Sequence, residues 1–242
     1  MDKIKFGLNG NKLKIIGAVS MTADHIGYML LPDEVILRAV GRLAFPLFAY
    51  FIYQGSIYTR NKLKYFSQIL GIGLLCVLGY YVYCREVYIN SLITFSMSVC
   101  ILYCIQFFKE RLKQNNILGC LSGAAGTFLF VGLSYFVCSR IDVDYGFQGV
   151  MLPVFAEIST SFCRSSAKET VIKFSLVGFA LGLIWLSYRF GGLQYICLFS
   201  LPFLFLYNGS RGSLNMKSFF YWFYPLHFLL IGGADCIINF LK

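Results

Sequence analysis

Long apolar runs, separated by short basic loops, constrain the fold of this chain more than any other feature. A membrane-spanning helix needs about 20 mainly apolar residues, whereas a transmembrane β-strand alternates apolar and polar residues over about ten. We expect nine spans, at residues 13–31, 35–58, 63–84, 87–108, 117–138, 147–163, 171–188, 193–207 and 218–240. The loops are too short to fold separately. The sequence therefore predicts an all-α polytopic membrane bundle that forms one domain over residues 1–242.

The composition supports a membrane protein and offers no metal motif. Of the residues, 58% are hydrophobic and 13% are charged, about half the charge of a soluble domain. The nine cysteines are scattered, mostly within apolar runs, and no CxxC pair occurs. We interpret them as small apolar residues rather than metal ligands, with Cys84 and Cys138 as the one pair placed to form a bridge. Walker, GxSxG and HExxH motifs are also lacking.

The distribution of lysine and arginine predicts the orientation of the chain. Fifteen of the 21 lie at the amino terminus or in alternate loops: Lys3, Lys5, Lys12, Lys14, Arg60, Lys62, Lys64, Lys109, Arg111, Lys113, Arg164, Lys168, Lys173, Arg211 and Lys217. Only four lie on the other side, namely Arg85, Arg140, Arg189 and Lys242. Cytoplasmic loops are enriched in these residues, so we expect a cytoplasmic amino terminus and an external carboxyl terminus. The net charge of +10 is then mainly an orientation signal, and we expect no nucleic-acid partner.

A few ionisable residues lie inside the predicted spans. Such residues are costly in a bilayer and often functional. They are Asp24, His25, Arg38, Arg42, Glu157, His227 and Asp235. Both histidines of the chain belong to this group. Each residue also has a structural interpretation, as one partner of a buried ion pair or as a packed, hydrogen-bonded side chain. For Glu157 and Asp235 we favour hydrogen bonding between helices.

The helical rise of 1.5 Å per residue gives the depth of these groups. His25 and Arg42 both lie roughly 9–10 Å below the outer surface, on antiparallel neighbouring spans joined by "PDE". Arg42 can therefore reach Asp24 or His25, and we expect it to pair with Asp24. Arg38, nearer the headgroups, is expected to extend toward them. His227 lies roughly 13 Å from the inner side, near mid-membrane.

Two further features concern the backbone. Pro46 lies inside the second predicted span, where it frees a carbonyl and is expected to kink the helix. The segment "NGSRGSLN" at 208–215 is a glycine-containing basic loop on the cytoplasmic side. Its backbone and Arg211 could hold a phosphate, although a plain turn is the commoner meaning of such a segment.

Several segments together resemble the TraX family, in order and at similar spacing, from about residue 13 to 232. They are "LKIIGAVSMTADHIG", "LRAVGRLAFPLFAYFIYQG", "YTRNKLKY", "DYGFQGVMLPV" and "FFYWFYPLHFLLI". The family is named for a conjugation protein that acetylates the amino terminus of F-type pilin. It is also similar to membrane-bound acyltransferases that carry a histidine in an early span.

The resemblance implies an acetyltransferase of the bacterial inner membrane that uses acetyl-CoA as co-substrate and no metal. Its site residues would be Asp24, His25, Arg42 and His227. The acceptor, at or beyond the outer face, would be a pilin amino terminus, a peptide, a glycan or a lipid. A neutral imidazole suits the general base, and Arg42 or His227 could stabilise the developing oxyanion. Cations at the cytoplasmic side could bind the phosphates of CoA: Arg60, Lys62, Lys64, Arg211 and Lys217.

Two alternatives remain open. A proton-coupled transporter would also bury Asp, His and Arg along a pathway, but inverted repeats with paired broken helices, which are common in transporters, are not evident. A non-catalytic membrane assembly protein is the second alternative, and it leaves two intramembrane histidines without a task.

Overall fold

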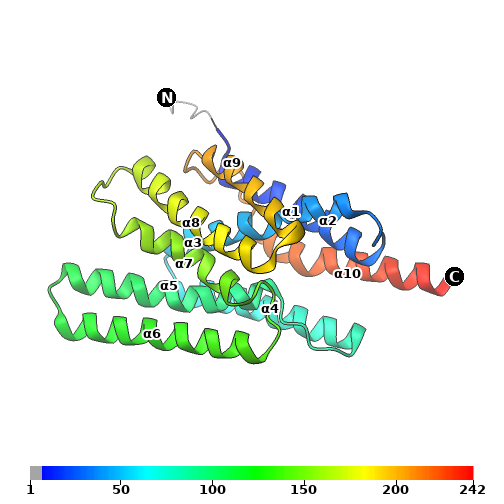
Figure 1. The fold of residues 1–242 in the computed structure, drawn as a ribbon, viewed down its shortest axis with the longest axis horizontal. Coiled ribbons are helices and arrows are strands. Elements are labelled where there is room, and N and C mark those ends of the chain that lie inside the picture. The colour runs from blue at the N-terminus through cyan, green and yellow to red at the C-terminus, as the bar shows by residue number, and fades with distance from the viewer. Residues whose placement is uncertain (1–6, 242) are drawn as a thin grey trace.

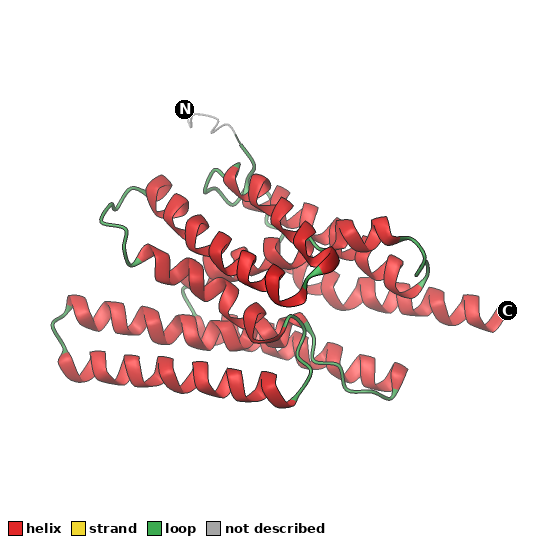
Figure 2. Cartoon of the chain, viewed as in Figure 1, coloured by secondary structure: helices red, strands yellow, loops and turns green. Residues whose placement is uncertain are grey.

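The structure is a computed structural model that describes residues 7–241. Within this range the chain is helical and forms no strand, only two isolated bridges (Figure 2). The elements are α1 (Gly10–Met29), α2 (Val35–Gly41), α3 (Ala44–Tyr58), α4 (Lys62–Cys84), α5 (Ser91–Lys113), α6 (Ile117–Arg140), α7 (Gly146–Thr160), α8 (Lys168–Phe190), the 3₁₀ helix η1 (Gly192–Phe199), α9 (Ser200–Phe205) and α10 (Lys217–Leu241). Lys3, Lys5 and Lys242 of the orientation argument lie outside the described residues.

Each of the nine predicted ranges corresponds to one helix or to two consecutive helices, but a count of nine spans is not confirmed. In the described chain, six helical segments are long and apolar enough to cross a membrane: Val35–Tyr58, Lys62–Cys84, Ser91–Lys113, Ile117–Arg140, Lys168–Phe190 and Ser218–Ile238. The remaining predicted spans match α1, which carries several charged residues, α7, which has 15 residues, and the short pair η1–α9. The protein is therefore a multi-pass membrane protein.

Helix α3 lies in the middle of the bundle, and α4 and α6 lie at its periphery (Figure 1). Ten of the 15 residues of α3 are buried, among them Tyr50 and Tyr53, which are the largest fully buried side chains. By contrast, α4 and α6 have two buried residues each, and their other faces expose leucine and aromatic side chains. An apolar outer face is what a helix in contact with lipid requires.

The loops gather at two ends of the bundle, which we call the basic end and the far end. At the basic end, on the left of Figure 1, the start of α1 pairs with the loop that follows α9, and the Lys168 ammonium donates to the Gly209 carbonyl. At the far end, Ile89 pairs with Val143 in the next loop but one. Each of these contacts joins segments that the distribution of lysine and arginine assigned to the same side.

The second predicted span is interrupted near Pro46. Helix α2 ends at Gly41, Arg42 and Leu43 form a turn, and α3 starts at Ala44. Pro46 is thus the third residue of a new helix, where a missing backbone N–H costs little. The N–H that Pro46 lacks would have bonded the Arg42 carbonyl. The break therefore falls at Arg42, the residue whose carbonyl Pro46 frees.

The polar residues outside the histidine region make contacts between helices. The Lys109 ammonium on α5 pairs with the Glu157 carboxylate on α7 and also donates to the Glu157 carbonyl at 2.9 Å. The Tyr83 hydroxyl on α4 donates to the Asp235 carboxylate on α10 at 2.7 Å. These contacts confirm the interpretation of Glu157 and Asp235. All nine cysteines are free, so the bridge considered for Cys84 and Cys138 is not formed.

Candidate functional site

A cavity of about 560 Å³ extends through the bundle between its two ends. Its volume is within the range of small-molecule sites, about 300–1,000 Å³. At the basic end it is lined by Asn11, Lys14, Lys168 and Arg211. At the far end it is lined by Asp24, His25, Tyr88 and Asp144. Cations and histidine therefore lie at opposite ends of one space.

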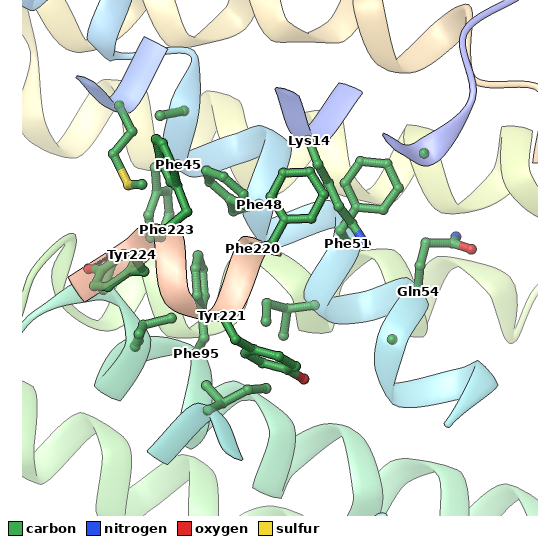
Figure 3. Close-up of a pocket in the computed structure, with 18 of the residues that line it drawn as sticks. Lys14, Phe45, Phe48, Phe51, Gln54, Phe95, Phe220, Tyr221, Phe223 and Tyr224 are labelled. Atoms are coloured by element: carbon green, nitrogen blue, oxygen red, sulfur yellow. Dashed lines mark hydrogen bonds between the residues drawn. The ribbon is translucent and has the colours of Figure 1, made fainter. Parts of the chain in front are cut away.

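Aromatic side chains form the walls between these ends. Figure 3 shows Phe45, Phe48 and Phe51 of α3 facing Phe220 and Phe223 of α10 across the cavity, all of them lining residues. Walls of this kind favour an elongated ligand with an apolar or weakly polar middle section, because they offer few hydrogen-bonding groups.

The two histidines are in direct contact near the far end. Nδ1 of His25 lies 2.8 Å from Nε2 of His227, and Nδ1 of His227 lies 2.8 Å from the Phe223 carbonyl oxygen. A carbonyl only accepts, so Nδ1 of His227 carries a proton. In neutral His227, Nε2 is then an acceptor, and Nδ1–H of His25 must donate to it. This leaves Nε2 of His25 with a free lone pair. A neutral imidazole with such a nitrogen can accept a proton.

Helix α10 holds this arrangement by packing around His227. The His227 ring stacks on Phe223 with a centroid distance of 5.0 Å, and the Phe228 ring meets His25 edge-on at 5.9 Å. His227 is buried. Our estimate of depth placed His227 well inside the level of His25, which is wrong. Counting residues from a predicted helix end assumes parallel helices with aligned ends, and the contact between His25 and His227 shows that this assumption fails for α1 and α10.

The structure contains the ion pair expected between Asp24 and Arg42. Oδ1 of Asp24 lies 2.6 Å from an Arg42 nitrogen, and Oδ2 lies 2.9 Å from Nη1 of Arg38. Arg38 therefore binds the carboxylate and does not extend toward the headgroups as expected. Gly41 permits this approach, since a Cβ there would lie 2.3 Å from the Asp24 side chain. Asp24 thus fixes the α1–α2 hairpin beside His25.

Asp144 is a cavity residue that the sequence analysis missed. It lies in the loop between α6 and α7, where its N–H donates to Ile89 and its carbonyl accepts from Thr94. Its carboxyl group interacts with the Tyr88 hydroxyl, and burial raises its pKa to about 7. The next residue, Tyr145, has a φ of +60°, a conformation that costs a non-glycine residue energy and often marks a functional site. The segment "DYG" was the signal available in the sequence.

The predicted phosphate-binding cations fall into two groups. Arg211 lines the cavity, but Arg60, Lys62 and Lys64 do not, and all three are exposed. The side chain of Lys217 lies outside the described part of the structure.

Two cations that line the basic end were not among the predicted cofactor-binding residues, Lys14 and Lys168. Lys14 lies on α1, where its ammonium is 5.0 Å from the Phe51 ring centroid, and Lys168 is the first residue of α8. In the sequence, these two lysines contributed only to the prediction of which side of the membrane each loop lies on.

At the basic end, the 208–215 loop packs against the start of α1. Its Ser210 and Arg211 carbonyls accept from the N–H groups of Gly10 and Asn11, and Asn11 donates to the Leu214 carbonyl at 2.7 Å. Those first helical N–H groups are therefore occupied. Gly209 and Gly212 have φ values of +73° and +99°, which explains the glycines of this segment as turn residues.

Among residues 7–241, no group of three or more His, Cys, Asp or Glu side chains is placed to hold a metal ion. The two histidines place a neutral imidazole beside a histidine partner, with the fixed charges of Asp24 and Arg42 nearby. It can accept a proton from a group held at the far end of the cavity.

Comparisons with known proteins match nearly the whole chain. A probable fimbrial assembly protein, FimC of serogroup H1, from Dichelobacter nodosus is 25% identical over 250 residues, which covers 94% of this chain and 96% of that protein. An uncharacterised protein of Rickettsia prowazekii (strain Madrid E) is 46% identical over 39 residues, or 16% of each chain. No solved structure matches. The family model described as TraX protein matches residues 9–234, a range that includes His25, Arg42, Asp144 and His227, and the chain therefore belongs to the TraX family.

Proposed function

We propose that this protein is a membrane-embedded acetyltransferase that moves an acetyl group from cytoplasmic acetyl-CoA to an acceptor at the outer side of the bilayer. One observation carries the proposal: a single cavity joins a cluster of cations at the basic end to the free imidazole nitrogen of His25 at the far end. The family name and the relative described as a fimbrial assembly protein support a pilus-related acceptor, such as a pilin amino terminus.

The basic end suits the phosphates of the donor. Lys14, Lys168 and Arg211 all line it, and charge-assisted contacts to phosphate are stronger than neutral hydrogen bonds. Along α1, Lys14 and His25 are eleven residues apart, or about 16 Å. The pantetheine arm of CoA is a narrow chain that could extend along the aromatic walls over this distance. The thioester would then lie near the histidines.

The chemical step requires one base and one path for the leaving group. The amine or hydroxyl of the acceptor attacks the thioester carbonyl carbon, and Nε2 of His25 takes its proton. A tetrahedral intermediate forms, and the positive charge of the protonated His25 is shared through its Nδ1–H bond to His227. The C–S bond then breaks and the proton passes to the departing sulfur, which gives free CoA and the acetylated acceptor. Arg42 does not line the cavity; through its ion pair with Asp24 it would hold the α1–α2 hairpin in place beside His25.

This assignment implies an orientation. The donor is cytoplasmic, so the basic end faces the cytoplasm, as the excess of lysine and arginine also indicates. With nine spans, the amino terminus would be inside and the carboxyl terminus outside, in the inner membrane of a bacterium. Reporter fusions after residues 60, 111, 168 and 213 should give cytoplasmic signals, and those after residues 85, 142 and 190 external ones. An external signal at residue 111 contradicts this orientation.

The decisive experiment uses the purified full-length protein in lipid nanodiscs with acetyl-CoA labelled in the acetyl group. We expect release of CoA and a labelled product when bacterial envelope extract supplies the acceptor. His25→Gln, which keeps a hydrogen-bonding group but no base, should bind CoA and form little product. If wild-type protein neither binds CoA nor releases it from acetyl-CoA, the acetyltransferase proposal is wrong.

A further inference from the structure

A second, small cavity of about 40 Å³ adjoins the first beside the histidine pair. His25 and His227 form part of its wall. The remaining wall is contributed by Cys76, Tyr80, Tyr88, Asn90, Tyr224 and Phe228. His25, Tyr88 and Tyr224 line both cavities. The small cavity is therefore a side chamber next to the proposed base, at the point where the donor arm would end.

Apart from the free Nε2 of His25, the polar groups of this chamber already have partners. Asn90 donates to the Gly73 carbonyl at 2.8 Å and accepts from the Leu92 N–H at 3.0 Å. The Tyr224 hydroxyl lies 3.0 Å from the Ser91 hydroxyl, and the Tyr88 hydroxyl interacts with Asp144. The Tyr80 hydroxyl interacts with the Cys84 thiol. What the chamber offers a ligand is thus mostly aromatic and thiol surface, which suits an apolar group.

The size of the chamber limits what can enter it. A cavity needs about 10–15 Å³ to hold one water molecule, so about 40 Å³ holds roughly three atoms of that size. An acetyl group has three heavy atoms. A peptide, glycan or lipid acceptor is far larger, and a longer acyl chain exceeds the volume of the chamber.

We propose that this chamber binds the acyl group of the donor and restricts the enzyme to acetyl, with Tyr80 and Phe228 as the residues that limit chain length. This inference rests on the proposed function and identifies the part of the site that selects the length of the acyl chain. While the acyl carbon exchanges its bond to sulfur for a bond to the acceptor, its methyl group remains in the chamber. The proton of the acceptor goes to His25 and then to the departing sulfur, as in the step above.

The test compares acetyl-, propionyl- and butyryl-CoA on the full-length protein in nanodiscs, with release of CoA as the measurement. One additional methylene that a pocket cannot accommodate lowers kcat/KM by about 10- to 200-fold, and we expect this preference for acetyl over propionyl in the wild type. Phe228→Ala and Tyr80→Ala each enlarge the chamber, and each should raise the propionyl-to-acetyl ratio of kcat/KM by tenfold or more.

Adjacent residues provide matched controls. Tyr81 and Leu229 follow the two chamber residues in sequence but are exposed, at 44% and 63%. Tyr81→Ala and Leu229→Ala should leave the propionyl-to-acetyl ratio unchanged. Cys76→Leu fills the chamber instead of emptying it, so it should lower acetyl-CoA turnover at least tenfold without weakening the binding of CoA. This variant keeps the test decisive if an alanine variant fails to fold.

The outcomes separate this inference from the function on which it rests. If the wild type uses all three acyl-CoAs equally well, or if Cys76→Leu turns over acetyl-CoA normally, the chamber does not bind the acyl group and the acetyltransferase proposal stands. If the wild type consumes none of the three donors, the proposed function itself fails.

Discussion

The two ends of the main cavity differ in how their charges are balanced. At the far end, the Asp24 carboxylate binds both Arg38 and Arg42. At the basic end, Lys168 donates to a carbonyl, Arg211 donates to the Asn215 side chain at 2.7 Å, and Lys14 lies over aromatic rings. Among the described residues that line the cavity, the acidic ones are Asp24 and Asp144, and both lie at the far end.

This difference indicates distinct tasks for the two ends. Charges that are already paired hold a site in one geometry and need no ligand for their stability. Cations that bond only neutral groups retain an attraction for an anion. Under the proposed function, the far end would serve as the fixed reaction site and the basic end would receive the negatively charged donor.

His25→Ala should have the largest effect. A positioned general base accelerates a reaction by about 10²- to 10⁴-fold, so acetyl transfer should fall by that factor while CoA binding, measured by calorimetry, stays within about twofold because the basic end is intact. The neighbouring Thr22→Ala, whose hydroxyl bonds only the Ala18 carbonyl of its own helix, is the control. If His25→Ala retains near-normal turnover, the reaction does not take place at the far end.

Asp24→Asn should destabilise the protein more than Arg42→Gln. Loss of the carboxylate leaves two guanidinium groups without their partner, whereas loss of Arg42 leaves Asp24 paired with Arg38. Breaking a buried pair costs about 3–5 kcal/mol, and we expect the lower end of this range for Asp24→Asn because the side chains retain some exposure. Thermal unfolding in detergent measures the difference. Equal losses for the two variants would show that Arg38 contributes nothing.

Arg211→Met should weaken CoA binding by about tenfold, because a hydrogen bond to a charged group contributes about 1.5 kcal/mol or more. Lys168→Met should act similarly. Lys62→Met is the matched control, since Lys62 lies near the same end over the Tyr103 ring but does not line the cavity. If Lys62→Met weakens binding as much as Arg211→Met, the attraction comes from the general positive surface and not from the cavity.

Asp144 should give the smallest effect, a pH dependence of stability. Its folded pKa of about 7 lies above its ordinary value of 3.8, so the folded state holds the proton more tightly. The resulting stability is full below about pH 4 and is lost as the pH rises to about 7. Because the Asp144 side chain is only partly buried, its charge is partly screened, and we expect roughly 1 kcal/mol between pH 5 and 8. Asp144→Asn should lack this dependence. If the stability of Asp144→Asn changes with pH as the wild type does, the pH dependence comes from another group.

The sequence alone determined the elements of the fold and their sorting to two ends. Apolar runs must form helices in a bilayer, because each backbone polar group needs a partner that lipid cannot provide. The lysine and arginine residues report the side on which each loop lies. The pairing of Asp24 with Arg42 also followed from the sequence, since a three-residue connection forces two helices to run back along each other. The motifs around Asp24, Arg42 and His227 were sufficient to indicate the family.

The tertiary structure decided which distant residues meet. His25 and His227 are separated by 202 positions, and no local pattern fixes the level at which α10 packs against α1. The cavity likewise depends on how the aromatic side chains of α3 and α10 pack. It selected Lys14, Lys168 and Asp144, which the sequence did not single out, and it left out Arg60, Lys62 and Lys64. Helix formation is local and can be predicted from composition and periodicity, but a site lies where helices cross, and crossing is set by side-chain packing between segments far apart in the chain.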